Sequence, residues 1–235
     1  MNDSSTPNLQ SIRTDYSDLE LSPKSVPKDP LQLFTNILDK AVADKLHTPN
    51  ACTLATADAQ GIPSARIVLL RQYNHDGFTF FTNYKSRKGV DLAHNPFATL
   101  LFFWPELETQ IRIAGEVSKA TEQVSDDYFA SRPIDSQIGA WASPQSEEIS
   151  NRAWLDEEMA SVQARFSDSE KVSVPRPEFW GGYVLTPQSI EFWKGRPNRL
   201  HDRIQYQRSS FETLSHSKGD GQHPEAIWQI SRLAP

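Results

Sequence analysis

The sequence has 235 residues, 37% apolar and 23% charged, and is long enough to bury one substantial core. Its formal net charge of -6 argues against a general nucleic-acid-binding protein, because such proteins usually present a net basic face. No apolar run approaches the roughly 20 residues that cross a bilayer, no export signal is visible, and the single cysteine, Cys52, cannot form an intrachain disulfide. We therefore expect a cytosolic protein that does not act on membranes or nucleic acid.

The pattern predicts a mobile N-terminal segment, residues 1–28, followed by a single domain over residues 29–235. A helix is expected over residues 29–46, because Asp29 suits an N-cap, Pro30 suits the first helical position, and apolar residues follow at helical spacing. Short apolar runs broken by turn residues then predict strands over residues 51–57, 64–71, 78–82, 98–104 and 109–119.

Three further segments open with a Ser or Thr that can cap a helix, and they predict helices over residues 86–95, 121–132 and 146–166. Toward the C-terminus, strands are expected over residues 181–186, 189–194, 201–208 and 225–231, with a polar loop at 215–225. Neighbouring strands joined by hairpin-length turns favour an antiparallel barrel over a βαβ sheet. The predicted fold class is mainly β with peripheral helices.

Common nucleotide and metal motifs are missing from the sequence: there is no GxGxxG, no GxxxxGK[ST], no HExxH and no paired CxxC. Cations instead occur within strand-like segments, where a half-buried charge is costly unless it meets an anion. Arg66 and Arg71 bracket one predicted strand and point to opposite faces by alternation, so a pocket touched by both lies near a sheet edge. The alternative is that both are solvated charges at strand ends.

A second basic feature is the segment FFTNYKSRKG, where a predicted helix starts at Ser86 with Arg87 and Lys88 in its first turn. Cations are unfavourable there, because the helix dipole prefers negative charge at its N-terminus. A bound anion would remove that objection, since backbone N–H groups, a guanidinium and an ammonium would converge on it. The segment therefore indicates a phosphate site.

Two further clusters suit anionic ligands. Tyr128, Arg132 and Ser136 can form a second phosphate clamp, with Ser136 in a predicted turn, although a helix-terminal arginine and a turn serine would look the same. A basic run follows Trp193 within sixteen residues and comprises Arg196, Arg199, His201, Arg203 and Arg208. In it, His201 can titrate near neutrality and Arg199 can stabilise developing negative charge. The residues alone thus indicate a barrel with two anion sites.

Taken together, the motifs resemble the pyridoxine/pyridoxamine 5'-phosphate oxidase family over residues 12–235. The similarity is carried by RIVLLR at 66–71, TNYKSRK at 82–88, SRPIDSQIGAW at 131–141, FWGGY at 179–183, IEFWKGRPNRLHDR at 190–203 and the final SRLAP. The resemblance implies an FMN-binding split β-barrel. It also implies an obligate homodimer with two equivalent flavin sites at the subunit interface.

The resemblance further implies roles for individual residues. The flavin contacts would be Arg66, Ile67, Val68, Leu69, Leu70, Arg71, Phe81, Thr82, Arg87, Lys88, Gln110, Gln145, Ser146, Trp193 and Arg203. The FMN phosphate would rest on Arg66, Arg87 and Lys88. The substrate-binding residues would be Arg13, Tyr16, Arg71, Tyr128, Arg132, Ser136, Arg199 and His201, with the catalytic pair Arg199 and His201 over the pyridine ring and Arg13 and Tyr16 in an N-terminal lid.

The implied reaction is oxidation of pyridoxamine or pyridoxine 5'-phosphate to pyridoxal 5'-phosphate, with O2 reduced to H2O2 and FMN supplying the redox chemistry. One departure from the family is Arg71, where a lysine is common; arginine keeps the charge but changes reach and geometry. The stretch after Arg208 is also longer than expected for bacterial members, which fits a surface loop.

Two other functions stay open. One is a flavin oxidase of another ring compound, as in phenazine-type relatives of this fold, and the other is a non-enzymatic carrier or sensor of flavin or pyridoxal phosphate. Retention of Arg132, Ser136, Arg199 and His201 favours the vitamin B6 oxidase.

Overall fold

The computed structural model describes residues 20–167, 174–209 and 227–235, in which nine strands form one antiparallel sheet with helices around it. The strands are β1 Ala51–Ala57, β2 Pro63–Leu69, β3 Gln72–Asn74, β4 Gly77–Asn83, β5 Phe97–Trp104, β6 Thr109–Lys119, β7 Trp180–Lys194, β8 Asp202–Arg208 and β9 Trp228–Leu233. The helices are α1 Pro30–Ala43, α2 Arg87–His94, α3 Glu122–Ser131, α4 Ile134–Ala142 and α5 Arg152–Ser167, with short 3-10 turns η2 Pro105–Leu107 and η3 Pro197–Arg199. The predicted class, mainly β with peripheral helices, is confirmed.

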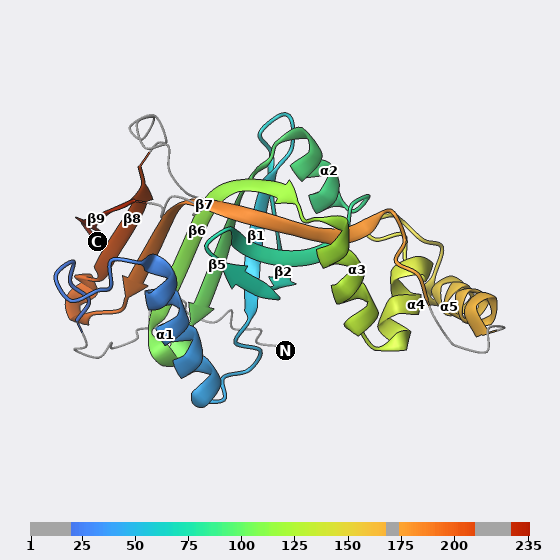
Figure 1. Cartoon of the computed structure of the whole chain (residues 1–235), viewed down its shortest axis with the longest axis horizontal. Coiled ribbons are helices and arrows are strands. Elements are labelled where there is room, and N and C mark those ends of the chain that lie inside the picture. The colour runs from blue at the N-terminus through green and yellow to red at the C-terminus, as the bar shows by residue number, and fades with distance from the viewer. Residues whose placement is uncertain (1–19, 168–173, 210–226) are drawn as a thin grey trace, which may run out of the picture.

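The strand order is β2-β1-β5-β6-β7-β4-β3, and β8 and β9 extend the sheet beside β7 (Figure 1). One edge of β7 is shared, because its first half pairs with β4 and its second half with β8. Directly after the edge strand β2, the N–H of Arg71 donates to the carbonyl of Thr79 in β4 at 2.9 Å. The sheet therefore curves until its β2 edge meets β4.

A β-bulge divides β7. Ser189 pairs with Ala114 of β6 but Pro187 pairs with Gly115, so Gln188 is an extra residue in β7. Before the bulge, odd-numbered residues such as Leu185 face the core, and after it even-numbered ones such as Phe192 do. Both halves of the strand consequently reach the same core, although strict alternation would have turned one half outward.

The main core lies between the curved sheet and α1. Asp29 caps α1 by accepting from the N–H of Leu31 at 2.9 Å, as predicted. The fully buried Phe34 of α1 packs edge-to-face on Phe78 and Phe102, with ring centroids 5.1 and 5.3 Å away. A smaller second core lies where α3 and α4 meet the start of β7, and its buried members are Phe129, Ile138, Val174 and Trp180.

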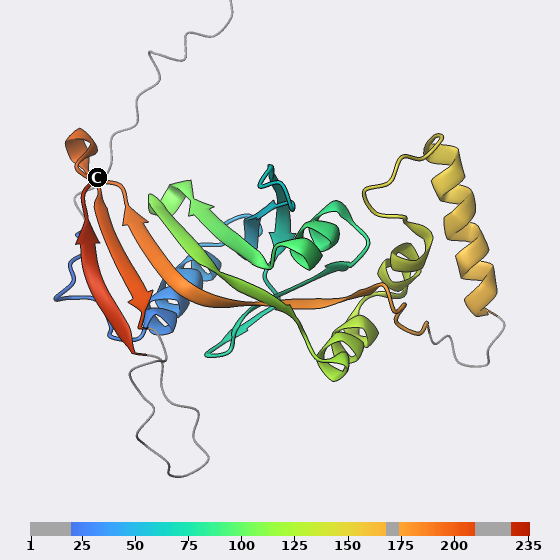
Figure 2. The same cartoon turned by 90° about the horizontal axis from the view of Figure 1, so that it is seen from above.

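Figure 2 shows how these two parts are connected. The long strand β7 runs from the α3–α4 region to the β8–β9 pair at the other end of the molecule. Among the described residues, no helix is long and apolar enough to cross a membrane.

Of two predicted helix starts, one is confirmed without its side-chain cap and the other is wrong. α2 begins directly after its N-cap residue Ser86, as predicted, but the Ser86 side chain makes no capping hydrogen bond, because its hydroxyl donates to the carbonyl of Asn83 at 2.7 Å and accepts from Lys88 at 3.1 Å. α5 begins at Arg152 instead of near residue 146, and the side chain of Asn151 accepts from the N–H of Trp154 at 2.9 Å. For α5, the capping side chain is therefore Asn151 and not Ser146.

Two other expectations need correction. Ser136 lies in α4 and not in a turn, since Pro133 starts a nine-residue helix directly after α3. The strands predicted over 181–186 and 189–194 are one strand, β7, because the Pro187 region forms a bulge and not a turn. The predicted polar loop at 215–225 and the segment 1–19 lie outside the described residues.

Candidate functional site

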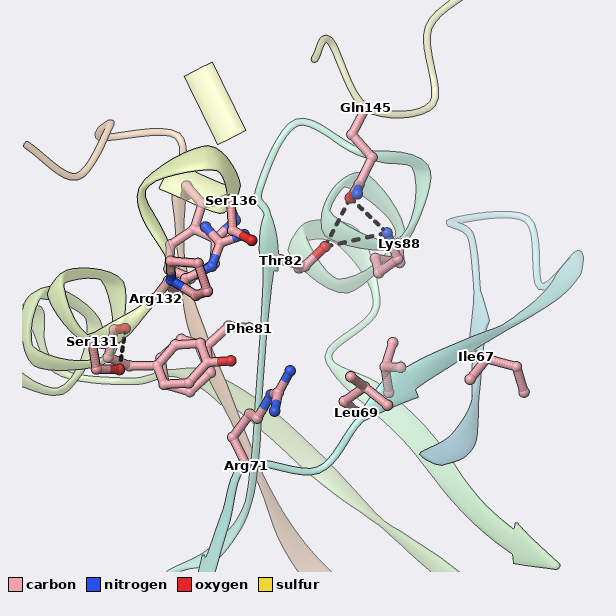
Figure 3. A pocket seen from close by; sticks show the side chains of 14 residues that line it. Ile67, Leu69, Arg71, Phe81, Thr82, Lys88, Ser131, Arg132, Ser136 and Gln145 are labelled. Atoms are coloured by element: carbon pink, nitrogen blue, oxygen red, sulfur yellow. Dashed lines mark hydrogen bonds between the residues drawn. The ribbon is translucent and has the colours of Figure 1, made fainter. Parts of the chain in front are cut away.

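A cavity of about 460 Å³ lies where β2, β4 and α2 face the α3–α4 connection (Figure 3). It is lined by Ile67, Val68, Leu69, Arg71, Phe81, Thr82, Lys88, Tyr128, Ser131, Arg132, Pro133, Ser136, Gln145 and Trp180. Three of these residues are cations, and none of the lining residues in the described part of the chain is acidic. The cavity is therefore suited to an anionic ligand.

Lys88 is the most deeply placed of the three cations, with 8% of its surface exposed. Its ammonium donates to Thr82 Oγ1 at 3.2 Å, Ser86 Oγ at 3.1 Å and Gln145 Oε1 at 2.9 Å (Figure 3 shows Lys88, Thr82 and Gln145). Within the described ranges it forms no ion pair with a carboxylate. Burial and the neighbouring charge of Arg66 lower the pKa of Lys88 to about 8. A bound anion would offset the free-energy cost of burying the Lys88 charge.

Two arginines lie beside Lys88 and share one buried carboxylate. Asp91 of α2 accepts from Arg87 Nε at 3.0 Å and from Thr56 Oγ1 at 2.7 Å, and lies 3.7 Å from Arg66 Nη2. Burial lowers the pKa of Arg66, while Asp91 acts in the opposite direction. Two arginines thus share one buried carboxylate beside the ammonium of Lys88, and the excess positive charge of the three cations can accommodate a phosphate.

The opposite wall of the cavity is built from aromatic rings and two further arginines. Tyr128 stacks on Phe81 with centroids 3.9 Å apart, and Arg71 lies over Tyr128 at 5.5 Å. Arg132 follows α3 and lies beside Ser136 in Figure 3. Its buried Nη1 has no hydrogen-bond partner in the described structure, and burial together with the charge of Arg71 lowers its pKa, which Tyr128 partly offsets. Arg132 therefore has donor capacity for an anion.

A second group of predicted site residues lies on β6, β7 and β8. Gln110, Trp193 and Arg203 stand opposite one another in register, and the ring of His201 lies 4.7 Å from that of Trp193. Arg203 Nε donates to the buried Glu191 at 2.8 Å, which raises the pKa of Arg203. These side chains form one continuous row on the sheet.

The loop before β8 has unusual backbone geometry. Asn198 and Arg199 both have positive φ values, 57° and 61°, which L-residues seldom adopt. Burial and the charge of Arg199 lower the pKa of His201, which favours its neutral imidazole. Consecutive strained residues tend to occur at functional sites.

Comparison with known proteins identifies the family. Residues 38–166 match the family model described as pyridoxamine 5'-phosphate oxidase, and residues 180–235 match the model described as the pyridoxine 5'-phosphate oxidase C-terminal dimerisation region. The chain belongs to the pyridoxamine 5'-phosphate oxidase family.

Named family members are similar over nearly the whole length. Proteins called pyridoxine/pyridoxamine 5'-phosphate oxidase from Salinibacter ruber and Burkholderia thailandensis are 47% and 49% identical to this chain, each over 97% of it and 99% of the relative. The chain thus retains the length of these oxidase-family relatives.

Two solved structures show the same fold. PhzG from Burkholderia lata 383, solved in complex with tetrahydrophenazine-1-carboxylic acid, is 29% identical with a TM-score of 0.79, covering 92% of this chain and 98% of that one. An FMN binding protein from Nostoc punctiforme related to pyridoxamine 5'-phosphate oxidase has a TM-score of 0.64 at 15% identity, covering 92% and 100%. The predicted antiparallel split β-barrel is confirmed.

Within this family member, the predicted site residues fall into three sets. The cavity holds Ile67, Val68, Leu69, Arg71, Phe81, Thr82, Lys88, Tyr128, Arg132, Ser136 and Gln145, with Arg66 and Arg87 beside Lys88. The row on β6 to β8 and the loop before it hold Gln110, Trp193, Arg199, His201 and Arg203. Of the remainder, Leu70 is buried in the core, Ser146 lies just beyond Gln145 with a φ of 76°, and Arg13 and Tyr16 lie outside the described residues.

Three lining residues were not predicted: Ser131, Pro133 and Trp180. Ser131 and Pro133 flank Arg132 in a motif that was recognised, so adjacency was the available signal. Trp180 lies in FWGGY, where an aromatic residue precedes two glycines. Gly182 has no room for a Cβ, which would lie 2.8 Å from Ala120 and 3.0 Å from Phe81. The two glycines after Trp180 were therefore the available signal, because they allow the strand to pack closely against Phe81 in the wall of the cavity.

Proposed function

We propose that this chain is an FMN-dependent oxidase that converts pyridoxamine and pyridoxine 5'-phosphates to pyridoxal 5'-phosphate. The observation that carries the proposal is the cavity lined by three cations and by no acidic residue of the described chain. Two phosphorylated molecules, the cofactor and the substrate, need such a surplus of positive charge. The names of the relatives at 47–49% identity support the substrate class.

The residues around Lys88 fit the phosphate of FMN. Lys88 is a buried cation without a carboxylate partner in the described structure, and Arg66 and Arg87 lie close by on either side of Asp91. We assign these three cations to the FMN phosphate. The contacts along the flavin are assigned to Ile67, Val68, Leu69, Leu70, Arg71, Phe81, Thr82, Gln145 and Ser146.

On the other wall we assign the substrate phosphate to Tyr128, Arg132 and Ser136, with Arg71 beside them. The distance between the two phosphate clamps then sets the substrate ring against the flavin ring, which lowers the entropic cost of reaction. Bound FMN would supply the redox chemistry, accepting a hydride equivalent from the substrate and transferring the electrons to O2, which becomes H2O2. Arg199 and His201 are assigned to orient the substrate ring.

The proposal requires a homodimer, because one chain does not bring its two groups of site residues together. Thirteen residue steps along β7 separate Trp180 at the cavity from Trp193, a path of roughly 40 Å at the rise of an extended strand. The family model over residues 180–235 is described as a dimerisation region. Two apolar side chains, Ile67 on β2 and Phe103 on β5, are 65% and 57% exposed. Such exposure is expected of residues that a second copy of the chain covers.

Gln110, Trp193, Arg199, His201 and Arg203 would then complete the cavity of the partner subunit. The same proposal includes residues 29–235 as one domain, residues 1–28 as a lid carrying Arg13 and Tyr16, and a cytosolic location, as expected from the sequence.

An anaerobic flavin spectrum tests the function. Purified protein reconstituted with FMN is mixed with pyridoxamine 5'-phosphate without oxygen, and then air is admitted. We expect the visible flavin absorbance to bleach, and then to recover with formation of aldehyde and H2O2. Flavin that binds but stays oxidised would remove the substrate assignment, and a protein that binds no flavin would remove the whole proposal.

A second candidate is a flavin oxidase of a ring carboxylic acid, favoured by the similarity to PhzG at a TM-score of 0.79. The cations of the cavity can bind a carboxylate as well as a phosphate. The same anaerobic experiment with tetrahydrophenazine-1-carboxylic acid separates the two candidates, because only the true substrate class will bleach the flavin rapidly.

A further inference from the structure

Trp180, the first residue of β7, is one of the residues that line the cavity. Its side chain is nearly buried, with 6% exposed. The ring stacks with Phe81 at 5.7 Å and 14° and is nearly parallel to Tyr128 at 6.2 Å and 8°. Trp180 thus lies in one aromatic stack with residues assigned to the flavin and to the substrate, although it carries no charge itself.

The guanidinium of Arg132 lies on this tryptophan. Its Cζ is 4.6 Å from the ring centroid of Trp180, closer than the 5.5 Å to Phe129. A cation over an aromatic face is attracted by the ring quadrupole, most strongly where water is excluded. The ring takes no conventional hydrogen bond from the guanidinium, and Arg132 Nη1 is buried with no hydrogen-bond partner in the described structure. The stacking therefore orients the arginine and leaves donor capacity for a ligand.

Trp180 is itself fixed to the helix that carries the clamp. Arg176 Nη1 donates to the carbonyl of Trp180 at 2.7 Å. The same guanidinium binds Asp126 at 2.6 Å and also Glu122, both on α3. Because α3 contains Tyr128 and ends directly before Arg132, the Arg176 contacts tie Trp180 to the helix that positions these two clamp residues.

We infer that Trp180 is a positioning residue for the anion clamp: it holds the Arg132 guanidinium in the orientation that receives the ligand's phosphate. The identity of the phosphate as that of the B6 substrate rests on the proposed function. The positioning role rests on the stacking, the unpaired Nη1 and the Arg176 contact, and it applies to any anion that Arg132 binds.

The test compares Trp180→Leu and Trp180→Phe in the FMN-loaded protein by titration calorimetry with pyridoxal 5'-phosphate, and in parallel with inorganic phosphate. We expect Trp180→Leu to weaken the binding of both probes roughly tenfold, and Trp180→Phe, which keeps an aromatic face, to weaken it about threefold or less. FMN affinity should change much less than probe affinity. If Trp180→Leu does not fold, as judged by circular dichroism, Trp180→Met takes its place.

A double-mutant cycle separates positioning from general loosening of the core. In an Arg132→Ala background, Trp180→Leu should cause no further loss of probe binding, because its effect passes through the arginine. Trp141→Leu is the matched control: Arg165 lies 5.1 Å over its ring, but Trp141 does not line the cavity, so probe binding should be unchanged.

The possible outcomes separate the positioning role of Trp180 from the proposed function. If the unmodified protein binds inorganic phosphate but not pyridoxal 5'-phosphate, the proposed function fails, and the phosphate series still decides the role of Trp180. Equal probe affinity in Trp180→Leu and the unmodified protein, or an equal loss with and without Arg132, would overturn the inference. If neither probe binds the unmodified protein, both proposals are wrong.

Discussion

Lys88 shows most directly how a single residue can define the site. Its ammonium contacts only neutral oxygen atoms in the described structure, and its pKa is lowered to about 8. A buried cation of this kind is costly until an anion arrives. The ligand-free protein therefore holds a charge that cofactor binding would stabilise.

Replacing this cation should weaken cofactor binding selectively. Hydrogen bonds to charged groups contribute about 1.5–3 kcal/mol, so Lys88→Met should raise the Kd for FMN by roughly 10- to 100-fold. Fluorescence titration of FMN measures this directly. Lys85→Met is the control, because Lys85 is exposed and lies over Phe179 outside the cavity, and its Kd should stay unchanged. Similar losses in both variants would contradict the role of Lys88.

The pH dependence has a definite sign. Below its pKa of about 8, Lys88 is charged and attracts the phosphate; above it the free protein loses that charge, so FMN affinity should fall as the pH rises through 8. The phosphate itself becomes a weaker ligand below its own pKa of roughly 6. Titrations between these limits should show a plateau, followed by a fall at high pH that is missing in Lys88→Met. The same fall in the variant would assign it to another group.

The charged part of the site could be predicted from the sequence, and its aromatic part could not. Arg66, Lys88 and Arg132 stand out because a cation in an apolar segment conflicts with its surroundings. Trp180 produces no such conflict, since a tryptophan in an apolar segment looks like an ordinary core residue. Its contact with Arg132 joins residues 48 positions apart in the chain, which local patterns cannot reveal.

At the scale of elements, the position of α2 depends on one glycine. A Cβ at Gly89 would lie 2.1 Å from the carbonyl oxygen of Tyr84, so the helix packs directly on the backbone of the preceding turn. This contact places Lys88 in the wall of the cavity and Arg87 beside it. Helix α4 also contains a glycine, Gly139, where a Cβ would meet only Met159 Sδ at 3.9 Å.

The two glycines predict opposite results for the same substitution. Gly89→Ala should destabilise the fold by roughly 1–3 kcal/mol through overpacking, and weaken FMN binding because α2 must move. Gly139→Ala should stabilise it by about 0.5–1 kcal/mol, since alanine is the better residue within a helix. Urea unfolding and FMN titration of both variants provide the check. A stabilised Gly89→Ala would show that α2 is not held by this contact.

Strands in which apolar and polar residues alternate clearly were predicted well. Elements that depend on contacts between residues far apart in the sequence were not. β1 and β6 have the predicted bounds, because their burial alternates along the whole strand. Helix α4 was missed since Pro133 and Ser136 suggest a turn, and its stability comes from packing in the second core. β7 was divided because Pro187 is typical of a turn, whereas pairing with β6 holds it within a bulge.

For the whole molecule, the separation of the two residue groups along β7 predicts a shared site. Lys88→Met and Arg199→Ala should each have little activity alone, and Arg199→Ala should still bind FMN. Mixing them with subunit exchange should restore about a quarter of the original activity, since half of the dimers are hybrids and each hybrid has one intact site. Activity after mixing, with each variant alone as control, is the measurement. No recovery despite exchange would place both groups in the same chain's site.

The bulge in β7 has a consequence for how this gene can change. Gln188 is the extra residue that reverses the inside–outside alternation, so Phe192 faces the core while Trp193 lies on the opposite face of the strand. Deletion of one residue at the bulge would exchange these two faces in one half of β7, and the apolar side chains of that half would turn away from the core. Deletion or insertion of two residues would keep every side chain on its face and change the spacing between the two groups of predicted site residues at the ends of β7. Tolerated insertions and deletions in this segment should therefore change its length by an even number of residues, because side chains alternate between the two faces of a strand.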